Sequence, residues 1–115
     1  MRLEGKVVLI TGAARGLGAC DAQWVAREGG KVIITDVLDG TGTAERIGAL
    51  FVHHDVTDEA AWIDLIARIR RDYGRLDGLV NNAGIVIPGT IETATLEDFR
   101  KVGAVSIEGT FLGCR

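Results

Sequence analysis

The start of the chain combines a short apolar run with closely spaced glycines. Residues Lys6–Thr11 (KVVLIT) are rich in β-branched side chains and apolar on both alternating faces, which is typical of a buried strand in a parallel sheet. The run leads directly into Thr11–Gly18 (TGAARGLG), and Gly16–Glu28 then has the apolar spacing of a helix. A strand that enters a helix through a glycine-rich turn restricts the fold to a small group of βαβ architectures.

The rest of the chain continues this alternation. Short runs of apolar and β-branched residues predict three further strands, at Lys31–Thr35, Ala49–His54 and Leu76–Asn81. A long helix is predicted after Thr57, ended by Gly74, and another after Thr95, where Thr95–Asp98 has the spacing of a capping box. Between these elements, Asp39–Gly48 is expected to contain only a short helical turn around Ala44–Ile47.

Each long helix has an apolar stripe that is expected to face the sheet. In the first helix the stripe consists of Leu17, Cys20, Trp24 and Val25. In the second it consists of Trp62, Ile66, Ile69 and Tyr73. In the last it consists of Leu96, Phe99, Val102 or Gly103, Ser106 or Ile107, Thr110 and Cys114.

Strands that alternate with helices at this spacing predict an α/β fold with a parallel sheet and right-handed crossovers. We expect a Rossmann-type sheet with the strand order 3-2-1-4, flanked by helices and ending after the fourth strand and the helix that follows it. The 115 residues are expected to form one partial domain, residues 1–115.

Composition excludes several other classes of protein. The net charge of −3 argues against an electrostatic grip on nucleic acid, and Arg68, Arg70, Arg71 and Arg75 suit the end of a helix. No apolar stretch approaches the roughly 20 residues that span a bilayer, and the N-terminus lacks a signal-peptide pattern, so a cytoplasmic location without a membrane partner is expected.

The residue types that most often bind metals are few. Two cysteines, Cys20 and Cys114, lie far apart and are expected to be buried, reduced helix residues. The adjacent His53 and His54 would point to opposite faces at the end of a strand, so they could not share a metal ion. We therefore expect no metal site.

The glycine spacing predicts a phosphate-binding turn. Gly12 permits a tight turn after Thr11, Gly16 lets the backbone approach a pyrophosphate, and Gly18 allows close helix–sheet packing. The phosphates would lie at the N-terminus of the following helix, where free N–H groups and the helix dipole favour anions. A purely structural glycine-rich turn is the alternative, which the preceding strand and following helix make less attractive.

Asp36, at the end of the second strand, indicates which dinucleotide is bound. It lies about 20 residues beyond the glycine turn, where an acidic side chain accepts hydrogen bonds from the adenosine ribose hydroxyls. A 2′-phosphate would be repelled there, and the next residue is Val37 rather than a basic one, so NAD(H) is favoured over NADP(H). Arg15 in the glycine turn argues the other way, because it could pair with a 2′-phosphate.

Together, four motifs resemble the short-chain dehydrogenase/reductase family. They are TGxxxGxG, Asp36, Asp55-Val56 after the third strand, and Asn81–Gly84 (NNAG) after the fourth, in that order over almost the whole chain. The resemblance implies that Asp55 bonds the adenine amino group and Val56 lies beside the ring. It implies that Asn82, Ala83 and Gly84 line the adenosine ribose and steady the sheet, and that Leu17 belongs to the cofactor turn.

The chain departs from the family pattern in two places. The last helix has Ser106 in Val105–Gly109 (VSIEG), where the family keeps an asparagine, so Ser106 is only a weak candidate for a catalytic role. The family's catalytic serine and Tyr-x-x-x-Lys are not among these residues, and the single tyrosine, Tyr73, is expected on a packed helix stripe. The resemblance therefore implies the cofactor-binding half of the enzyme, which we expect to be inactive alone.

The leading interpretation is an NAD(H)-dependent oxidoreductase that acts on a secondary alcohol or ketone and is similar to bacterial hydroxysteroid and cyclic-alcohol dehydrogenases. A non-catalytic nucleotide-binding or oligomerisation module remains open. A methyltransferase is disfavoured by the NNAG turn and the glycine spacing, and a P-loop NTPase is excluded because no lysine follows the glycines. We also expect a homo-oligomer, because the strand with Leu79 and Val80 would leave an open edge, and Phe99, Ile107 and Phe111 lie around more than one helix face.

Overall fold

A computed structural model describes residues 1–115 and contains one parallel sheet of four strands. The strands are β1 (Val7–Thr11), β2 (Lys31–Asp36), β3 (Leu50–His53) and β4 (Gly78–Val80). Their order is β3-β2-β1-β4, as predicted, and every neighbouring pair is parallel. The strand order therefore reverses between β1 and β4. This is the topological switch point, where open α/β sheets form their binding crevice.

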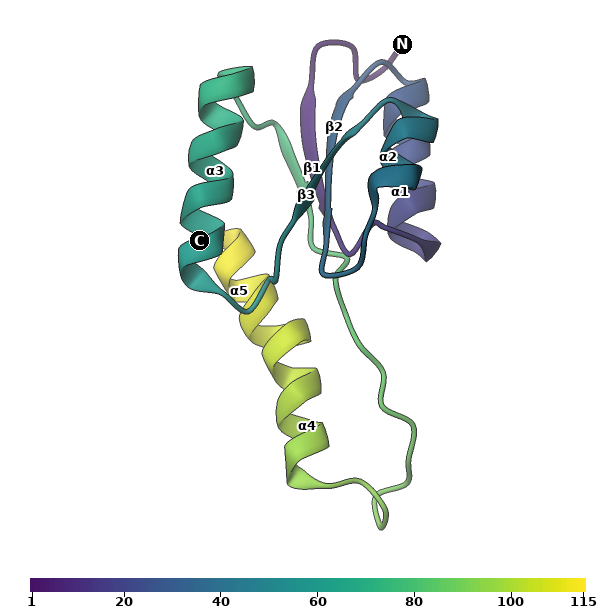
Figure 1. Ribbon diagram of the computed structural model, residues 1–115, viewed down its shortest axis with the longest axis vertical. Coiled ribbons are helices and arrows are strands. Elements are labelled where there is room, and N and C mark those ends of the chain that lie inside the picture. Colours follow the sequence, from purple (N-terminus) through teal and green to yellow (C-terminus); the bar gives the residue numbers. More distant parts are fainter.

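Helices cover both faces of the sheet (Figure 1). The helices α1 (Gly16–Arg27) and α2 (Thr41–Ile47) lie on one face, and α3 (Glu59–Tyr73) lies on the other with the end of the last helix. Alternate residues of β1 separate two cores, because Val7 and Leu9 pack with α3, whereas Val8 and Ile10 pack with α1 and α2. This two-sided burial accounts for the continuous apolar runs of the central strands.

The predicted apolar stripe of α1 is confirmed only at Val25, which is half-buried and packs against the core on this face of the sheet. Leu17 is 79% exposed and Trp24 is 57% exposed, whereas the buried residues of the helix are Gly18 and Ala22. Small residues face the sheet because the helix approaches it closely: a Cβ atom on Gly18 would lie 2.5 Å from Nδ2 of Asn82. Large apolar side chains are consequently displaced to the outer face.

The cysteines also differ from the expectation. Cys20 and Cys114 are both free and exposed rather than buried. Cys20 lies on the solvent side of α1 because the small residues occupy the inner side, and Cys114 lies at the C-terminal end of the chain.

The predicted start and end of α3 are confirmed. The Asp58 side chain caps its N-terminus by accepting a hydrogen bond from the Ala61 N–H at 3.1 Å. Gly74 ends it in the left-handed conformation, with φ of +77°. Trp62 and Ile69 are buried as predicted, and Leu65 is buried with them. In contrast, α2 is longer than the predicted short turn, because it spans Thr41–Ile47 before Gly48 ends it.

The last helix has three parts. It consists of α4 (Leu96–Gly103), the π-helical segment η1 (Ala104–Glu108) and α5 (Gly109–Cys114). The Thr95 hydroxyl accepts a hydrogen bond from the Asp98 N–H at 3.1 Å, as the capping pattern predicts. The predicted stripe is wrong, because Leu96 and Phe99 are 60% and 73% exposed. The side that packs contains Val105, Gly109 and Leu112.

The position of α4 explains this difference. Leu96 and Phe99 precede the π-helical segment and lie in α4, which extends away from the sheet, so neither side chain has the sheet to pack against (Figure 1). With the loop before it, α4 extends away from the sheet as a protruding arm (Figure 1), and it packs chiefly on η1. None of the helices combines the length and apolarity required to cross a membrane.

Candidate nucleotide-binding site

A cavity of about 480 Å³ lies at the carboxyl ends of the strands. It draws residues from the loops that follow all four strands and one residue from the last helix. Its lining includes the following predicted residues: Gly12, Arg15, Gly16, Asp36, Val37, Asp55, Val56, Asn82, Ala83 and Gly84. The motifs identified separately in the sequence therefore meet at one site.

The glycine turn has the backbone conformation that glycine alone adopts easily. Gly12 and Gly16 have φ of +64° and +67°. A Cβ atom on Gly12 would lie 2.7 Å from Cα of Ala83, so the turn fits closely against the loop after β4. A Cβ atom on Gly16 would meet nothing within 4 Å, so this glycine faces open space in the cavity.

The N-terminus of α1 leaves its backbone amides free of side-chain acceptors. Its N-cap residue, Arg15, has extended backbone angles and makes no side-chain capping bond, and the first turn contains no acidic residue. The helices α3 and α4, in contrast, are capped by Asp58 and Thr95. Free amides and the positive end of a helix dipole are suited to an anion such as a phosphate.

Asp36 connects the end of β2 to the glycine turn. Its Oδ2 accepts a hydrogen bond from the Ala14 N–H at 3.0 Å, and its Oδ1 accepts one from the Leu38 N–H at 3.1 Å. Each carboxylate oxygen has a second lone pair, so the side chain can also accept bonds from a ligand hydroxyl. The adjacent Val37 is 56% exposed and Arg15 is exposed, so both side chains are free to reach a ligand.

The loop after β3 places a carboxylate beside an apolar wall. Asp55 is exposed and accepts bonds from the hydroxyl and the N–H of Thr57, at 2.7 and 2.9 Å. The bond from the Thr57 hydroxyl is the largest cause that lowers the pKa of Asp55 below its usual value, and the bond from the Thr57 N–H is the second. The side chain is therefore a hydrogen-bond acceptor at neutral pH. Val56 is buried, and its carbonyl accepts a bond of 2.8 Å from the indole N–H of Trp62.

His54 precedes this pair and is 3% exposed. Its ring packs edge-on against Trp62, with centroids 4.5 Å apart, and its Nε2 has no hydrogen-bond partner. Burial lowers the pKa of His54, although the nearby Asp55 and Asp58 act in the opposite direction. A neutral imidazole therefore forms part of the cavity wall next to Asp55.

Hydrogen bonds attach the loop after β4 to β1. The Thr11 hydroxyl accepts from the N–H groups of Asn82 and Ala83, at 3.2 and 3.0 Å. The Asn82 side-chain amide donates to the carbonyls of Thr11 and Gly12, at 3.1 and 3.0 Å. Thr11 is buried beneath the cavity and does not line it.

Ser106 lies in the π-helical segment and does not line the cavity. Its Oγ is 3.8 Å from the position of a Cβ atom on Gly84, so the last helix does bring it beside the loop after β4. Its carbonyl accepts a bond of 2.8 Å from the Thr110 hydroxyl. Nothing in this arrangement gives the Ser106 hydroxyl an acid or base as a partner.

Two other predicted residues are not at the cavity wall, and four unpredicted ones are. The Leu17 side chain points to solvent and Gly18 packs against the sheet. Sequence reasoning missed Leu38, His54, Ile85 and Val105. Each of them adjoins a motif residue in the sequence, which was the available signal. No group of three or more His, Cys, Asp or Glu side chains could hold a metal ion.

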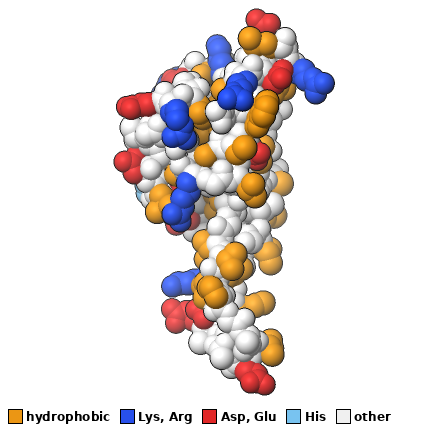
Figure 2. Space-filling model, turned by 90° about the vertical axis from the view of Figure 1, so that its right-hand side faces the viewer, with side chains coloured by type: hydrophobic (Ala, Val, Ile, Leu, Met, Phe, Trp, Pro, Cys, Tyr) orange, Lys and Arg blue, Asp and Glu red, His pale blue; other side chains and the backbone are white.

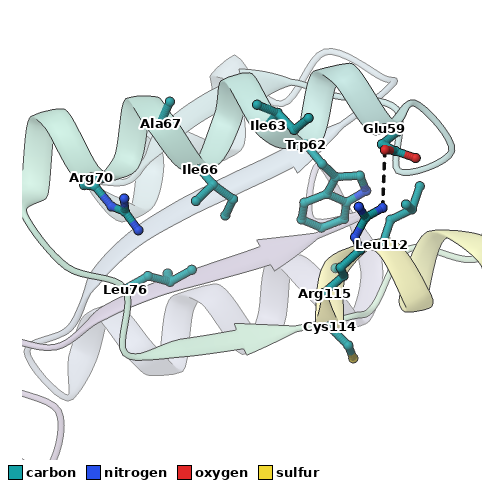
Figure 3. A pocket seen from close by; sticks show the side chains of 11 residues that line it. Glu59, Trp62, Ile63, Ile66, Ala67, Arg70, Leu76, Leu112, Cys114 and Arg115 are labelled. Carbon is teal, nitrogen blue, oxygen red and sulfur yellow. Dashed lines mark hydrogen bonds and ion pairs between the residues drawn. The ribbon is translucent and has the colours of Figure 1, made fainter.

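A second cavity, of about 580 Å³, lies between α3 and α5. Its lining is mostly apolar, and Trp62 and Ile66 point into it from α3 (Figure 3). An ion pair between Glu59 and Arg115, with atoms 3.3 Å apart, crosses one end. This cavity contains no chemistry-bearing cluster comparable to that at the strand ends.

The whole chain can be compared with known proteins. Residues 6–115 match the family model of the short chain dehydrogenases, so the chain belongs to this family. It is 42% identical, over 118 residues, to the 3-beta-hydroxysteroid dehydrogenase of Comamonas testosteroni, covering 99% of this chain and 46% of that protein. It is 41% identical, over 127 residues, to the trans-4-hydroxycyclohexanecarboxylate dehydrogenase of Sinomonas cyclohexanicum, covering 99% of this chain and 49% of that protein.

The fold comparison agrees with the family. The crystal structure of levodione reductase superposes with a TM-score of 0.90 and 34% sequence identity, covering 97% of this chain and 47% of that one. The chain thus spans about half the length of the relatives that it matches. The resemblance inferred from the four motifs is confirmed, and so is the parallel sheet predicted from the alternation of strands and helices.

Proposed function

We propose that the chain binds NAD(H) and forms the cofactor-binding part of an oxidoreductase acting on a secondary alcohol or ketone. The observation that carries this proposal is the cavity at the strand ends, where four separate motifs converge. The cofactor, when bound, supplies the site that accepts or releases hydride. Residues 1–115 are then one partial dinucleotide-binding domain.

Each part of the cavity has a proposed role toward the cofactor. The free amides at the start of α1, beside Gly16, hold the pyrophosphate. Asp36 accepts bonds from the ribose hydroxyls, and the Asp55 carboxylate accepts one from the adenine amino group while Val56 covers the ring. The loop that contains Asn82, Ala83 and Gly84 lines the ribose.

The preference for NAD(H) over NADP(H) rests on charge. A 2′-phosphate would approach the Asp36 carboxylate, whereas Val37 offers no compensating positive charge. Arg15 lines the same cavity and opposes this preference. We propose that Asp36 decides the preference between the two cofactors, because two backbone hydrogen bonds fix its carboxylate, whereas the Arg15 side chain is exposed.

The proposal for the reaction draws on the relatives, which are about twice as long as this chain. The names of the two relatives favour a hydroxysteroid or a cyclic alcohol as substrate. Ser106, at the family's asparagine position, is the one proposed catalytic residue among these 115, and its shorter side chain could not hold a relay water as an asparagine does. The 115 residues contain no Tyr-x-x-x-Lys, so we expect no turnover of an alcohol by this polypeptide alone. We also propose a cytoplasmic homo-oligomer.

A second candidate function is a non-catalytic nucleotide-binding or oligomerisation module. It is favoured by the apolar side chains that α4 and the loop before it expose, including Phe99, which is 73% exposed, and Ile91, which is 96% exposed. Such a module would use the same cavity for NAD(H) and the protruding arm for association, with no chemistry of its own.

A nitrogen-15 NMR titration of the 115-residue protein with NAD+, adenosine and nicotinamide mononucleotide tests the proposal. We expect saturable shifts for NAD+ at the amides of Gly16, Leu38 and Val56, and the first turn of α1 should not respond to adenosine. Absence of saturable binding by NAD+ to a folded chain would overturn the proposed function. Saturable binding confined to the cavity between α3 and α5 would overturn the assignment of the site.

A further inference from the structure

Ala14, in the middle of the glycine turn, is held by two hydrogen bonds of its own and by one of the preceding residue. Its N–H donates to Asp36 Oδ2 at 3.0 Å, and its carbonyl accepts a bond of 2.6 Å from the Thr43 hydroxyl. The preceding N–H, of Ala13, donates to the Thr35 carbonyl at 3.0 Å. The turn is therefore attached both to the end of β2 and, through Thr43, to α2.

The contact with Thr43 lies immediately before the N-terminus of α1. Ala14 precedes the N-cap residue Arg15, whose φ and ψ are −156° and 177°. The Ala14 carbonyl and the Arg15 N–H belong to one planar trans peptide and point in opposite directions. Holding the carbonyl against α2 thus turns the Arg15 N–H away from α2 and fixes the direction in which the chain enters α1.

The position of α2 makes this contact possible. Gly40, just before the helix, packs so closely that a Cβ atom there would lie 2.7 Å from the Phe51 ring and 3.4 Å from Cα of Ala14. One turn later, Thr43 is partly buried and reaches Ala14 across 29 positions of sequence. The short helix of seven residues, Thr41–Ile47, is thereby seated against the outer side of the glycine turn.

We propose that Thr43 is a positioning residue for the phosphate-binding turn: its hydroxyl fixes the Ala14–Arg15 peptide so that the first amides of α1 face a ligand pyrophosphate. The inference rests on the proposed function of the cavity, and it adds a residue of α2 that does not line the cavity itself. The proposed role predicts a difference between ligands that contain phosphate and ligands that do not. Binding of a pyrophosphate group should depend on Thr43, and binding of adenosine, which lacks phosphate, should not.

The test compares Thr43→Val, which keeps the shape and removes the hydroxyl, with Thr43→Ser, which keeps the hydroxyl. Dissociation constants for ADP and for adenosine are measured by NMR titration of the full 115-residue chain, whose spectra also show whether each variant is folded. We expect Thr43→Val to weaken ADP binding roughly fivefold, the usual effect of one hydrogen bond, and to leave adenosine binding unchanged. Thr43→Ser should restore ADP binding.

Thr41→Val is the matched control. Thr41 lies in the same helix, and its hydroxyl bonds to Asp39 at 2.6 Å, away from the glycine turn. Its loss should leave both ligands unaffected. Thr43→Ala supplies a second hydroxyl-free variant and should reproduce the loss seen with Thr43→Val.

Three outcomes would overturn the role of Thr43. They are unchanged ADP binding by Thr43→Val, equal weakening of ADP and adenosine, and a loss in Thr41→Val of the same size. Failure of the unmodified protein to bind either ligand would instead overturn the proposed function, and the inference with it. The two failures are distinguishable because only the second appears without any substitution.

Discussion

The indole N–H of Trp62 donates a hydrogen bond of 2.8 Å to the carbonyl of Val56. Both residues are buried, at 4% and 7% exposure, so the bond fixes the loop after β3 from inside the core. On its other side Val56 meets the last helix, where a Cβ atom on Gly109 would lie 2.6 Å from Cγ2 of Val56. The proposed adenine wall is therefore positioned by a helix on either side.

Trp62→Phe should lower the free energy of unfolding and weaken adenosine binding, because it removes the hydrogen bond that fixes Val56. The Val56 carbonyl would lose its partner in a buried place, which costs about 1–3 kcal/mol of unfolding free energy, in addition to the cost of the smaller ring. We expect adenosine binding to weaken as well, because Val56 becomes free to move. Chemical denaturation and adenosine titration measure the two effects. Trp24→Phe, at the 57% exposed Trp24, is the control and should be within about 0.5 kcal/mol of the parent.

Asp36→Ala should narrow the preference for NAD(H) over NADP(H) by roughly tenfold, because the carboxylate both repels a 2′-phosphate and accepts ribose hydroxyls. The same change removes the acceptor for the Ala14 and Leu38 N–H groups, so NAD(H) binding should also weaken in absolute terms. Titration of both cofactors gives the ratio. Asp39→Ala is matched, since Asp39 also accepts a backbone N–H bond, and it should leave the ratio unchanged.

If the parent protein binds NADP(H) as tightly as NAD(H), the assigned preference is wrong and Arg15 becomes the residue to test. Arg15→Ala should then lower the affinity for NADP(H) selectively.

The free energy of unfolding should fall as the pH is lowered from 7.5 to 5.5, and His54 should account for part of that fall. Burial lowers the pKa of His54 in the folded chain below the usual 6.5. Below pH 6.5 the unfolded chain therefore takes up a proton that the folded chain binds less readily, so stability decreases until the pH reaches the folded pKa. Below that point the contribution of His54 no longer changes.

His54→Phe keeps an aromatic ring against Trp62 and removes the titrating group, so urea denaturation curves at the two pH values should lie closer together than in the parent. His53→Gln, at the exposed neighbour, is the control and should change the pH dependence less than His54→Phe, because His53 is the smallest of the causes that act on the pKa of His54. An equal pH dependence in His54→Phe and the parent would show that other groups cause it.

The protein should associate through its protruding arm. Figure 2 shows apolar side chains along this part of the surface, where Val86 is 88% exposed and Leu96 is 60% exposed. Phe99→Lys combined with Leu96→Lys should shift the population toward monomer, because each exposed apolar side chain that becomes buried contributes about 1.5–3 kcal/mol. Light scattering over a dilution series measures the shift.

Leu17→Lys is the control for association, because Leu17 is 79% exposed on α1, far from the arm in sequence. A parent protein that stays monomeric at high concentration would contradict the expectation of an oligomer.

The sequence predicted the parallel sheet, the strand order and most cavity residues, because these depend on local patterns. A β-branched run, a glycine turn and an acidic residue at a strand end each specify backbone geometry or chemistry within a few positions. Once the order of the strands is known, the loops at their carboxyl ends must meet. Asp36, Asp55 and Asn82 consequently lie around one cavity although they are distant in sequence.

Packing faces of the helices were predicted less well. In α1 the close approach to the sheet selects Gly18 and Ala22, whereas a search for large apolar side chains selects Leu17 and Trp24. In the last helix the mispredicted residues Leu96 and Phe99 lie in α4, which extends away from the sheet (Figure 1), and a helical repeat does not indicate where a helix lies relative to a sheet. The contact between Thr43 and Ala14 depends on the tertiary position of α2, so no local pattern indicates it.

The protruding arm has a consequence for how unfolding of this protein should be measured. From Gly84 to Lys101 no residue is buried, whereas both tryptophans belong to helices packed on the sheet. Segments with few buried contacts open independently of the core and at lower free energy. Tryptophan fluorescence will therefore report the cooperative unfolding of the sheet with its packed helices, and it will not detect local unfolding of the arm. Amide hydrogen exchange, resolved by residue, is the observable that separates these two units of stability.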